Sequence, residues 1–278
     1  MCSSDLVKEN EVAPTCTVAG SYDSVAYCSV CNAEISRETV AVEALGHTEE
    51  ILPAVEATCT EDGLTEGKKC SVCNEILVAQ EVIPATGHEW KGTGCTKCDA
   101  TRNNPFEDVP EDSFYIDPVL WAVEKGITTG ATATTFNPNG ECQRAAVVTF
   151  LWRAAGSPEP ASTVNPFTDV TEADFFYKAV LWAVEKGITN GLTADTFGPY
   201  ALCNRAQVVT FLYRAMGNPV VTNTNNPFTD VVATDWYGPA VLWAVEKGVT
   251  NGLSATEFGV ERICNRAQVV TFLYRAYN

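Results

Sequence analysis

The chain has 278 residues, of which 46% are hydrophobic and 19% are charged, and its net charge is −17. This apolar content is enough for one or two packed cores, so we expect a globular protein. The negative charge argues against a nucleic-acid partner, because phosphate backbones select clustered Lys and Arg. No run of eighteen apolar residues occurs, which predicts that there is no membrane span.

The first six residues, MCSSDL, match the translated end of a common sequencing adapter. We therefore expect residues 1–6 to be an artefact and the chain to be a metagenomic fragment; a genuine N-terminus is the alternative. On the first interpretation Cys2 has no role. The missing signal peptide then says nothing about where the protein is located.

Residues 7–102 are rich in cysteine and lack helical periodicity, which predicts two small β-rich modules at 7–50 and 51–102. Each module contains a single Cys, a Cys-x-x-Cys pair and a His. Three sulfurs and one imidazole make a complete tetrahedral ligand set for structural Zn²⁺. The predicted ligands are Cys16, Cys28, Cys31 and His47 in the first module, and Cys59, Cys70, Cys73 and His88 in the second.

Disulfide bonding is the alternative for these cysteines, since secreted proteins commonly oxidise their thiols. A thioredoxin-like redox role does not fit, because no strand–Cys-x-x-Cys–helix context surrounds either pair. Cys95 and Cys98 form a further pair with no histidine after it, which suggests a truncated third module at the end of 51–102.

From residue 103 onward a 61-residue period dominates, and it divides the chain into repeats at 103–163, 164–224 and 225–278. Each repeat opens with an Asn-Pro-Phe turn, in which Pro fixes the backbone. An almost wholly apolar helix, VLWAVEKG, follows, with Lys-Gly as its predicted cationic end and left-handed cap. A loop then leads to a second helix. We therefore expect this region to be mostly α.

The second helix of two repeats begins with a capping-box pattern, formed by Asn204 with Gln207 and by Asn265 with Gln268. The preceding residues of the three repeats, Cys142, Cys203 and Cys264, take the position of a hydrophobic staple. We expect them to be small buried hydrophobes. In the first repeat Gln143 stands at the cap position, so that helix should begin less firmly.

The ordered pattern F-x-D-V, an aromatic pair, W-A-V-E-K-G, G-x-F-x-P and x-R-A-x resembles three tandem S-layer homology domains over residues 104–278. The resemblance implies a pseudo-threefold assembly with grooves between repeats. It also implies an extracellular protein, attached without covalent bonds to a secondary cell-wall polysaccharide that often bears pyruvate ketals. Residues 7–102 resemble Cys/His modules found upstream of such anchors in Firmicutes-type surface proteins.

The family's helix-start motif is Thr-Arg-Ala-Glu, and here the arginine is kept while the acid is lost. An arginine in the first turn of a helix favours a carboxylate, because backbone N–H groups point the same way. The alternative is that each arginine ties neighbouring repeats together through Asp or Glu. The paired aromatics could stack on a sugar face, although core packing is the better prediction for at least one of each pair. The predicted polysaccharide-binding residues are Arg144, Arg205, Arg266, Trp236, Gln207 and Gln268.

No catalytic constellation occurs in the sequence, and both histidines are assigned to metal, so we expect no enzymatic activity. The predicted function is anchoring to the cell wall, with the polysaccharide as the main partner and other surface proteins as further candidates. The alternative is that the chain is the C-terminal anchor of a surface enzyme, such as a cell-wall hydrolase, whose catalytic domain is missing.

Overall fold

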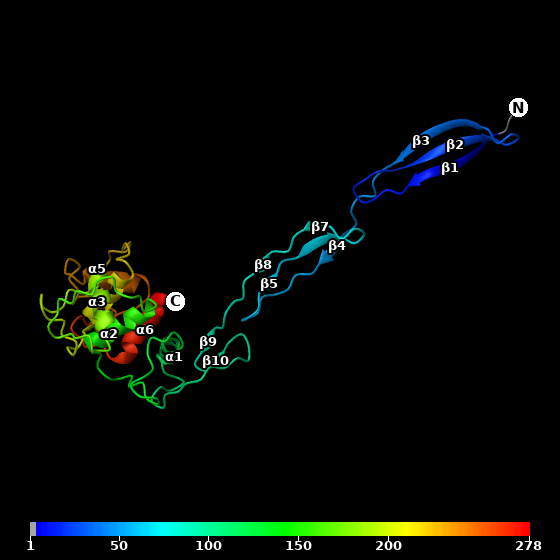
Figure 1. Ribbon diagram of the computed structural model, residues 1–278. Helices are drawn as coiled ribbons and strands as arrows, with labels where there is room; N and C mark the ends of the chain where they lie inside the picture. Colours follow the sequence, from blue (N-terminus) through cyan, green and yellow to red (C-terminus); the bar gives the residue numbers. More distant parts are fainter. Residues whose placement is uncertain (1–3) are drawn as a thin grey trace. The chain divides into compact units, whose positions relative to one another are not determined.

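The computed structural model describes residues 4–278, which divide into two units between Glu89 and Trp90 (Figure 1). The first unit contains strands β1 to β8, and the second contains β9, β10 and six helices. Within 4–278, no helix is both long and apolar enough to cross a membrane. Of the predicted adapter segment, residues 1–3 lie outside the described residues and residues 4–6 belong to β1.

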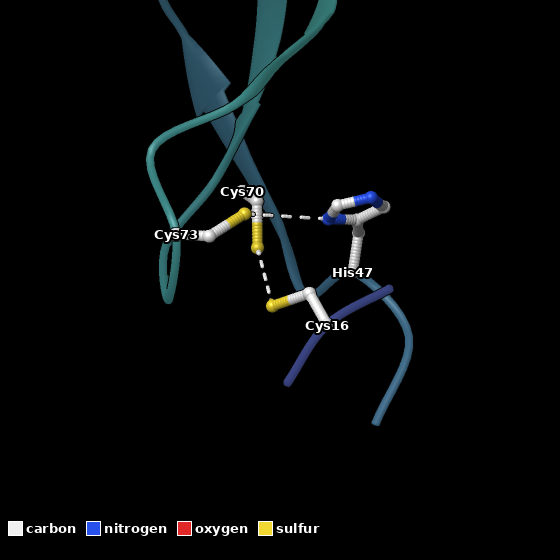
Figure 2. A group of neighbouring side chains, drawn as sticks. All are labelled: Cys16, His47, Cys70 and Cys73. Carbon is white, nitrogen blue, oxygen red and sulfur yellow. Dashed lines mark hydrogen bonds between the residues drawn. The ribbon is translucent and has the colours of Figure 1, made fainter. Parts of the chain in front are cut away.

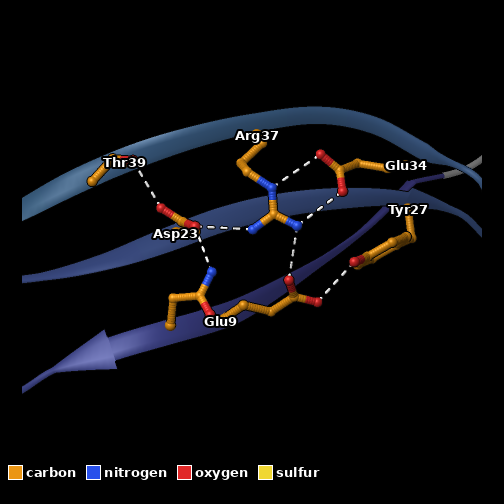
Figure 3. Close-up of polar contacts among 7 residues, drawn as sticks. Glu9, Asp23, Tyr27, Glu34, Arg37 and Thr39 are labelled. Atoms are coloured by element: carbon orange, nitrogen blue, oxygen red, sulfur yellow. Dashed lines mark hydrogen bonds and ion pairs between the residues drawn. The ribbon is translucent and has the colours of Figure 1, made fainter.

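The first sheet is an antiparallel meander of β1 (Ser4–Val12), β2 (Gly20–Cys28) and β3 (Glu34–Val42). A polar network covers one region of this sheet (Figure 3). The guanidinium of Arg37 donates hydrogen bonds of 2.9 Å to carboxylates on all three strands, those of Glu9, Asp23 and Glu34. Because the network joins every strand to its neighbours, it stabilises the sheet without an apolar core.

The remaining strands of the first unit are short. One sheet contains β4 (Glu49–Leu52), β6 (Gly67–Cys70) and β7 (Ile76–Val78), and another pairs β5 (Gly63–Leu64) with β8 (Val82–Ile83). Within the described part of this unit, the buried apolar residues are Cys16, Val25, Ala26, Cys28 and Cys70. So small a set does not provide a core that could hold the unit together by itself.

The second unit begins at Trp90. Strands β9 (Trp90–Lys91) and β10 (Gly94–Cys95) form a small ribbon. Arg102 attaches the ribbon to the first helix, because its guanidinium donates to Asp117 and lies 5.1 Å from the ring centroid of Trp90. Cys95 and Cys98 therefore lie in the unit that contains the helical repeats.

Each repeat contributes two helices, and side chains fix the segments between them. The helices are α1 (Ile116–Glu124), α2 (Arg144–Ala154), α3 (Tyr177–Glu185), α4 (Arg205–Ala215), α5 (Gly238–Glu246) and α6 (Arg266–Tyr277). In the opening turn, Asn165 accepts a hydrogen bond from the Phe167 N–H and donates to the Val170 carbonyl oxygen. The first helices end as predicted, with lysine at the C-cap followed by a left-handed glycine, as at Gly126 (φ 66°).

The three repeats close into a ring. The first helix of each repeat packs on the second helix of another, so that α3 contacts α2, α5 contacts α4, and α1 contacts α6. At the centre, backbone N–H groups donate in a cycle over 2.9 Å, from Cys142 to Cys264, from Cys203 to Cys142 and from Cys264 to Cys203. All three cysteines are at most 1% exposed, which confirms that they are small buried hydrophobes.

The predicted fold class is wrong, because the C-terminal region is not mostly α. Helices account for 22% of the whole chain and strands for 19%. The six helices are only 9 to 12 residues long, and long loops separate them. These loops keep their shape through hydrogen bonds between side chains and the backbone, so the chain does not need helices there.

Candidate functional site

The predicted arginines of the first two repeats lie buried between repeats, with exposed fractions of 2% for Arg144 and 3% for Arg205. Nε of Arg144 donates to the Phe197 carbonyl oxygen over 3.0 Å, and Nη2 donates to the Thr189 hydroxyl over 3.2 Å. In the same way, Nε of Arg205 donates to the Phe258 carbonyl oxygen and its Nη2 donates to the Thr250 hydroxyl. Both arginines thus tie one repeat to the next through a carbonyl and a hydroxyl instead of Asp or Glu.

The helix starts beside these arginines offer fewer free N–H groups than we expected. In α2, the Arg144 N–H donates to the Ala201 carbonyl oxygen and the Ala145 N–H donates to that of Pro199. In α6, the Arg266 N–H donates to the Gly140 carbonyl oxygen and the Ala267 N–H donates to that of Pro138. Another repeat therefore satisfies groups that would otherwise bind an anion.

Arg266 differs from the other two arginines. Its Nε donates to the Phe136 carbonyl oxygen over 2.9 Å, and the guanidinium carbon lies 4.9 Å from the centroid of that ring. Its Nη2 is buried and has no hydrogen-bond partner, the single such side-chain nitrogen or oxygen found within residues 4–278. Burial lowers the pKa of this guanidinium from its usual value. A buried donor without a partner favours binding of an acceptor.

A cavity of about 230 Å³ lies beside Arg266, and we call it the Arg266 groove. All three repeats contribute to its lining, which includes Thr128, Thr129, Gly130, Arg153, Phe175 and Arg266. Phe175 is 70% exposed, whereas the ring of the adjacent Phe176 is buried. The groove thus combines two guanidinium groups with one exposed aromatic ring, a combination suited to an acidic sugar.

A second cavity, of about 490 Å³, lies beside Arg205, and we call it the Arg205 groove. Its charged and polar lining includes Glu141, Arg205, Glu261, Arg262, Asn265 and Gln268. Gln207 and Gln268 both complete the predicted capping boxes, since their side-chain oxygens accept from the Asn204 and Asn265 N–H groups. Trp236 is 56% exposed beside buried Tyr237, in the position that Phe175 takes one repeat earlier.

A candidate metal centre lies in the first unit, where Cys16, His47, Cys70 and Cys73 come together (Figure 2). One ligand atom from each residue lies within 4.8 Å of all the others. The sulfurs of Cys16 and Cys70 are 3.7 Å apart, and the Cys73 sulfur is 3.5 Å from Nδ1 of His47. We call these four residues the Cys/His cluster.

The structure divides the two ligand sets that the sequence predicted. Cys16 precedes β2 and Cys28 ends it, and nine residues of strand span about 27 Å, too far for two ligands of one ion. Cys28 is disulfide-bonded, and Cys31 is exposed. Cys70 and Cys73, predicted as ligands together with Cys59 and His88, lie in the Cys/His cluster instead.

Backbone pairing brings the segments of the Cys/His cluster together. Strand β6 places Cys70 opposite Glu49 of β4, two residues after His47. The Ser71 N–H donates to the Thr48 carbonyl oxygen, and the Gly46 N–H donates to that of Cys16. These bonds hold all three segments in place through the backbone.

The thiols of the chain have contrasting acidities. The pKa of Cys70 is lowered to about 5, chiefly by a hydrogen bond from the Cys73 backbone N–H, while burial raises that of Cys16 to about 11. At the centre of the repeats, burial raises the pKa of Cys142, Cys203 and Cys264 to about 12. The three central thiols therefore stay protonated and unreactive at neutral pH.

The sequence prediction missed two kinds of residue. Glu75 lies 3.4 Å from Nε2 of His47, on the side of the ring away from the Cys73 sulfur. The aspartate of each F-x-D-V motif accepts hydrogen bonds from the loop before the second helix, as when Asp230 accepts from the Phe258 and Gly259 N–H groups. Its recurrence every 61 residues was the signal that could have identified this role.

Comparison with known proteins agrees with the repeat architecture. The S-layer homology domain family matches residues 105–147, 166–209 and 227–270. An S-layer protein of Bacillus thuringiensis subsp. finitimus is 27% identical over 70% of this chain, and an endoglucanase of Bacillus sp. (strain KSM-635) is 33% identical over 40% of it. The chain spans 24% of the first relative and 12% of the second.

Each matched stretch covers the first helix of one repeat and the beginning of its second helix. A cell surface protein of Thermoanaerobacter kivui is 27% identical over 56% of the chain, which spans 19% of that protein. The chain therefore contains three tandem S-layer homology domains, an arrangement that supports a Firmicutes-type surface protein.

Proposed function

We propose that the three repeats bind a secondary cell-wall polysaccharide that carries carboxylates, such as pyruvate ketals, and that the Arg266 groove takes up the carboxylate. The observation that carries this proposal is the buried Nη2 of Arg266, which has no partner within the described chain. Leaving such a donor unpaired costs roughly 1–3 kcal/mol. A carboxylate would restore the hydrogen bond and add charge attraction.

The exposed aromatic rings supply the second part of this proposal. Phe175 lies at the Arg266 groove, where its open face offers a platform for a sugar ring. Trp236 offers the same platform one repeat later. In the Arg205 groove, Arg205 and Gln268 would contact neighbouring sugars of the same polymer, while Arg144 and Gln207 hold the corresponding positions of the remaining repeat. Engagement of several grooves by one polymer would raise the overall affinity.

A competing carboxylate tests this assignment without disturbing the core. Thr129 is exposed and lines the Arg266 groove, so the carboxylate of Thr129→Asp would pair with Arg266 and repel the ligand. We expect wall binding to weaken by about tenfold to a hundredfold, the equivalent of roughly 1.5–3 kcal/mol. The matched control is Asn190→Asp, an exposed position beside Arg144, whose Nη2 already has a partner. Equal effects of the two variants would contradict the assignment.

A second candidate function is that the repeats anchor a surface enzyme. It is favoured by the relatives named as an endoglucanase and, in Acetivibrio thermocellus, as an exoglucanase, the latter 24% identical over 61% of the chain. Reading the gene upstream of the codon for residue 7 distinguishes the two candidates. A catalytic domain there would support the enzyme, whereas further Cys/His modules would support a structural surface protein.

We further propose that Zn²⁺ is a structural cofactor of the first unit. Three thiolates with one imidazole suit zinc, and binding of a structural zinc ion contributes roughly 10–16 kcal/mol at neutral pH. With so few buried apolar residues the unit needs such a contribution. Chelation of the reduced full-length chain should therefore remove hydrogen-exchange protection from β4 and β6 and leave the helical circular dichroism unchanged. Unchanged protection would contradict a structural role for zinc.

A further inference from the structure

We propose that Cys16, His47, Cys70 and Cys73 form one zinc site that joins two consecutive modules, in place of a separate site inside each module. The inference rests on the proposal that the chain binds zinc and goes on to name the ligands and what they connect. Cys16 and His47 belong to the module at 7–50, and the Cys70–Cys73 pair belongs to the module at 51–102.

Two distances in the Cys/His cluster match those of a tetrahedral zinc site. With zinc–sulfur distances of about 2.3 Å and zinc–nitrogen distances of about 2.0–2.1 Å, two sulfurs of one site lie about 3.8 Å apart, and a sulfur and a nitrogen about 3.5 Å. The cluster has 3.7 Å between the sulfurs of Cys16 and Cys70, and 3.5 Å between the Cys73 sulfur and His47 Nδ1. A disulfide would need about 2.05 Å.

The histidine is held in the orientation that a metal ligand requires. Its Nδ1 lies toward the Cys73 sulfur, while its Nε2 is 3.4 Å from a carboxylate oxygen of Glu75. A carboxylate on the second nitrogen fixes the tautomer that leaves the first nitrogen free to bind metal. Glu75 follows the Cys-x-x-Cys turn, so a single segment supplies two ligands and the group that orients a third.

The connection between modules follows from the elements that carry the ligands. Cys16 lies in the turn between β1 and β2, and His47 lies in the segment between β3 and β4. Cys70 and Cys73 lie at the turn between β6 and β7. An ion held by all four would therefore fasten the end of the first sheet to the end of the next. Cys31, in the equivalent turn of the first module, is outside the cluster.

The order of ligands along the chain is thus a cysteine, a histidine, and then the Cys-x-x-Cys pair of the following module. The same order of residue types recurs in the sequence as Cys59, His88, Cys95 and Cys98. Sharing the site suits two modules that are each too small for a core, because one ion then supports both of them.

Zinc content of the reduced full-length chain tests the inference. We expect Cys16→Ser and Cys73→Ser each to hold one zinc ion fewer per chain than the unmodified protein by native mass spectrometry. The matched control, Cys31→Ser, changes the corresponding exposed cysteine of the first module and should keep the full zinc content. If Cys31→Ser also loses a zinc ion, Cys31 is itself a ligand. The shared site is then overturned and the zinc proposal stands.

A measurement on the unmodified chain avoids variants that fail to fold. Alkylation with iodoacetamide, with zinc chloride added or with zinc removed, should show that zinc protects Cys16, Cys70 and Cys73 together and leaves Cys31 equally reactive. If zinc protects Cys31 from alkylation together with Cys16, the shared site is overturned. A chain that takes up no zinc, with unchanged alkylation, would overturn both the cofactor proposal and this inference.

Discussion

Arg266 donates a hydrogen bond from Nε to the Phe136 carbonyl oxygen over 2.9 Å, although the two residues lie 130 positions apart in the sequence. This bond joins the third repeat to the first, beside the packing of α6 on α1 and the bond from the Cys142 N–H to the Cys264 carbonyl oxygen. The three repeats therefore form a closed ring in which each depends on both others.

Deletion of residues 226–278 tests this dependence. The deletion exposes the α6-facing side of α1 and the α5-facing side of α4, and it removes both hydrogen-bond partners of the Arg205 guanidinium. We expect the two remaining repeats to unfold or aggregate, because elements that share one core fold together. Size-exclusion chromatography and thermal circular dichroism provide the readouts. A monomeric two-repeat chain with a cooperative transition would contradict the closed ring.

The aspartate of the F-x-D-V motif should contribute to stability. Asp230 accepts hydrogen bonds from three successive N–H groups, those of Phe258, Gly259 and Val260. Asp230→Ala leaves these donors without their acceptor, and we expect a loss of about 1–3 kcal/mol in the free energy of unfolding. Chemical denaturation measures it. Glu257→Ala, at an exposed position in the same loop, is the control for charge and should change the stability little.

A single substitution should stabilise the first repeat. Gln143 is the N-cap of α2 and makes no side-chain capping bond, whereas Asn204 and Asn265 accept from the third helical N–H group in α4 and α6. Gln143→Asn supplies the missing acceptor, so we expect the free energy of unfolding to rise by about 0.5–1 kcal/mol. The reverse change, Asn204→Gln, should lower the free energy of unfolding by a similar amount. A gain from both variants in thermal melts would argue against capping as the cause.

The polar network of the first sheet predicts a dependence on pH. A hydrogen bond from Asn10 is the largest effect that lowers the pKa of Asp23 below 3.8, and one from Arg37 lowers that of Glu34 below 4.5. Groups with lowered pKa stabilise the fold above their unfolded values, and this contribution disappears as the pH falls through the folded values. We expect hydrogen-exchange protection of β2 to be constant from pH 5 to 8 and to decline below about pH 4.

Replacement of the cation provides the control for that prediction. Arg37→Met removes the hydrogen bonds that join Glu9, Asp23 and Glu34. Protection of β2 should then be lower at neutral pH and should change less on acidification. A decline with the same shape in both proteins would show that other carboxylates cause it.

Local patterns in the sequence predicted the local structure well. Asn204 with Gln207, and Asn265 with Gln268, form capping boxes as predicted, because capping depends on neighbours within one turn. The same patterns located the helices but overestimated their share of the chain. The loops between them are ordered by Asn side chains that bond within the same turn and by Asp side chains whose bonds reach 28 residues along the chain.

Relationships between repeats and modules were not predictable from spacing. The segments at 203–215 and 264–276 are identical, yet Nη2 of Arg205 bonds to Thr250 and Nη2 of Arg266 has no partner. In the first unit, short spacing suggested that Cys16 and Cys28 were close, but an extended strand separates them.

Binding to purified cell walls tests the central claim most directly. The full-length chain is mixed with sacculi that retain the secondary polysaccharide and with sacculi stripped of it, and the dissociation constant is measured for each by sedimentation. We predict binding to the first kind that weakens by about tenfold to a hundredfold in Thr129→Asp, and no specific binding to the second. Equal binding to both kinds of sacculi would contradict attachment through the polysaccharide.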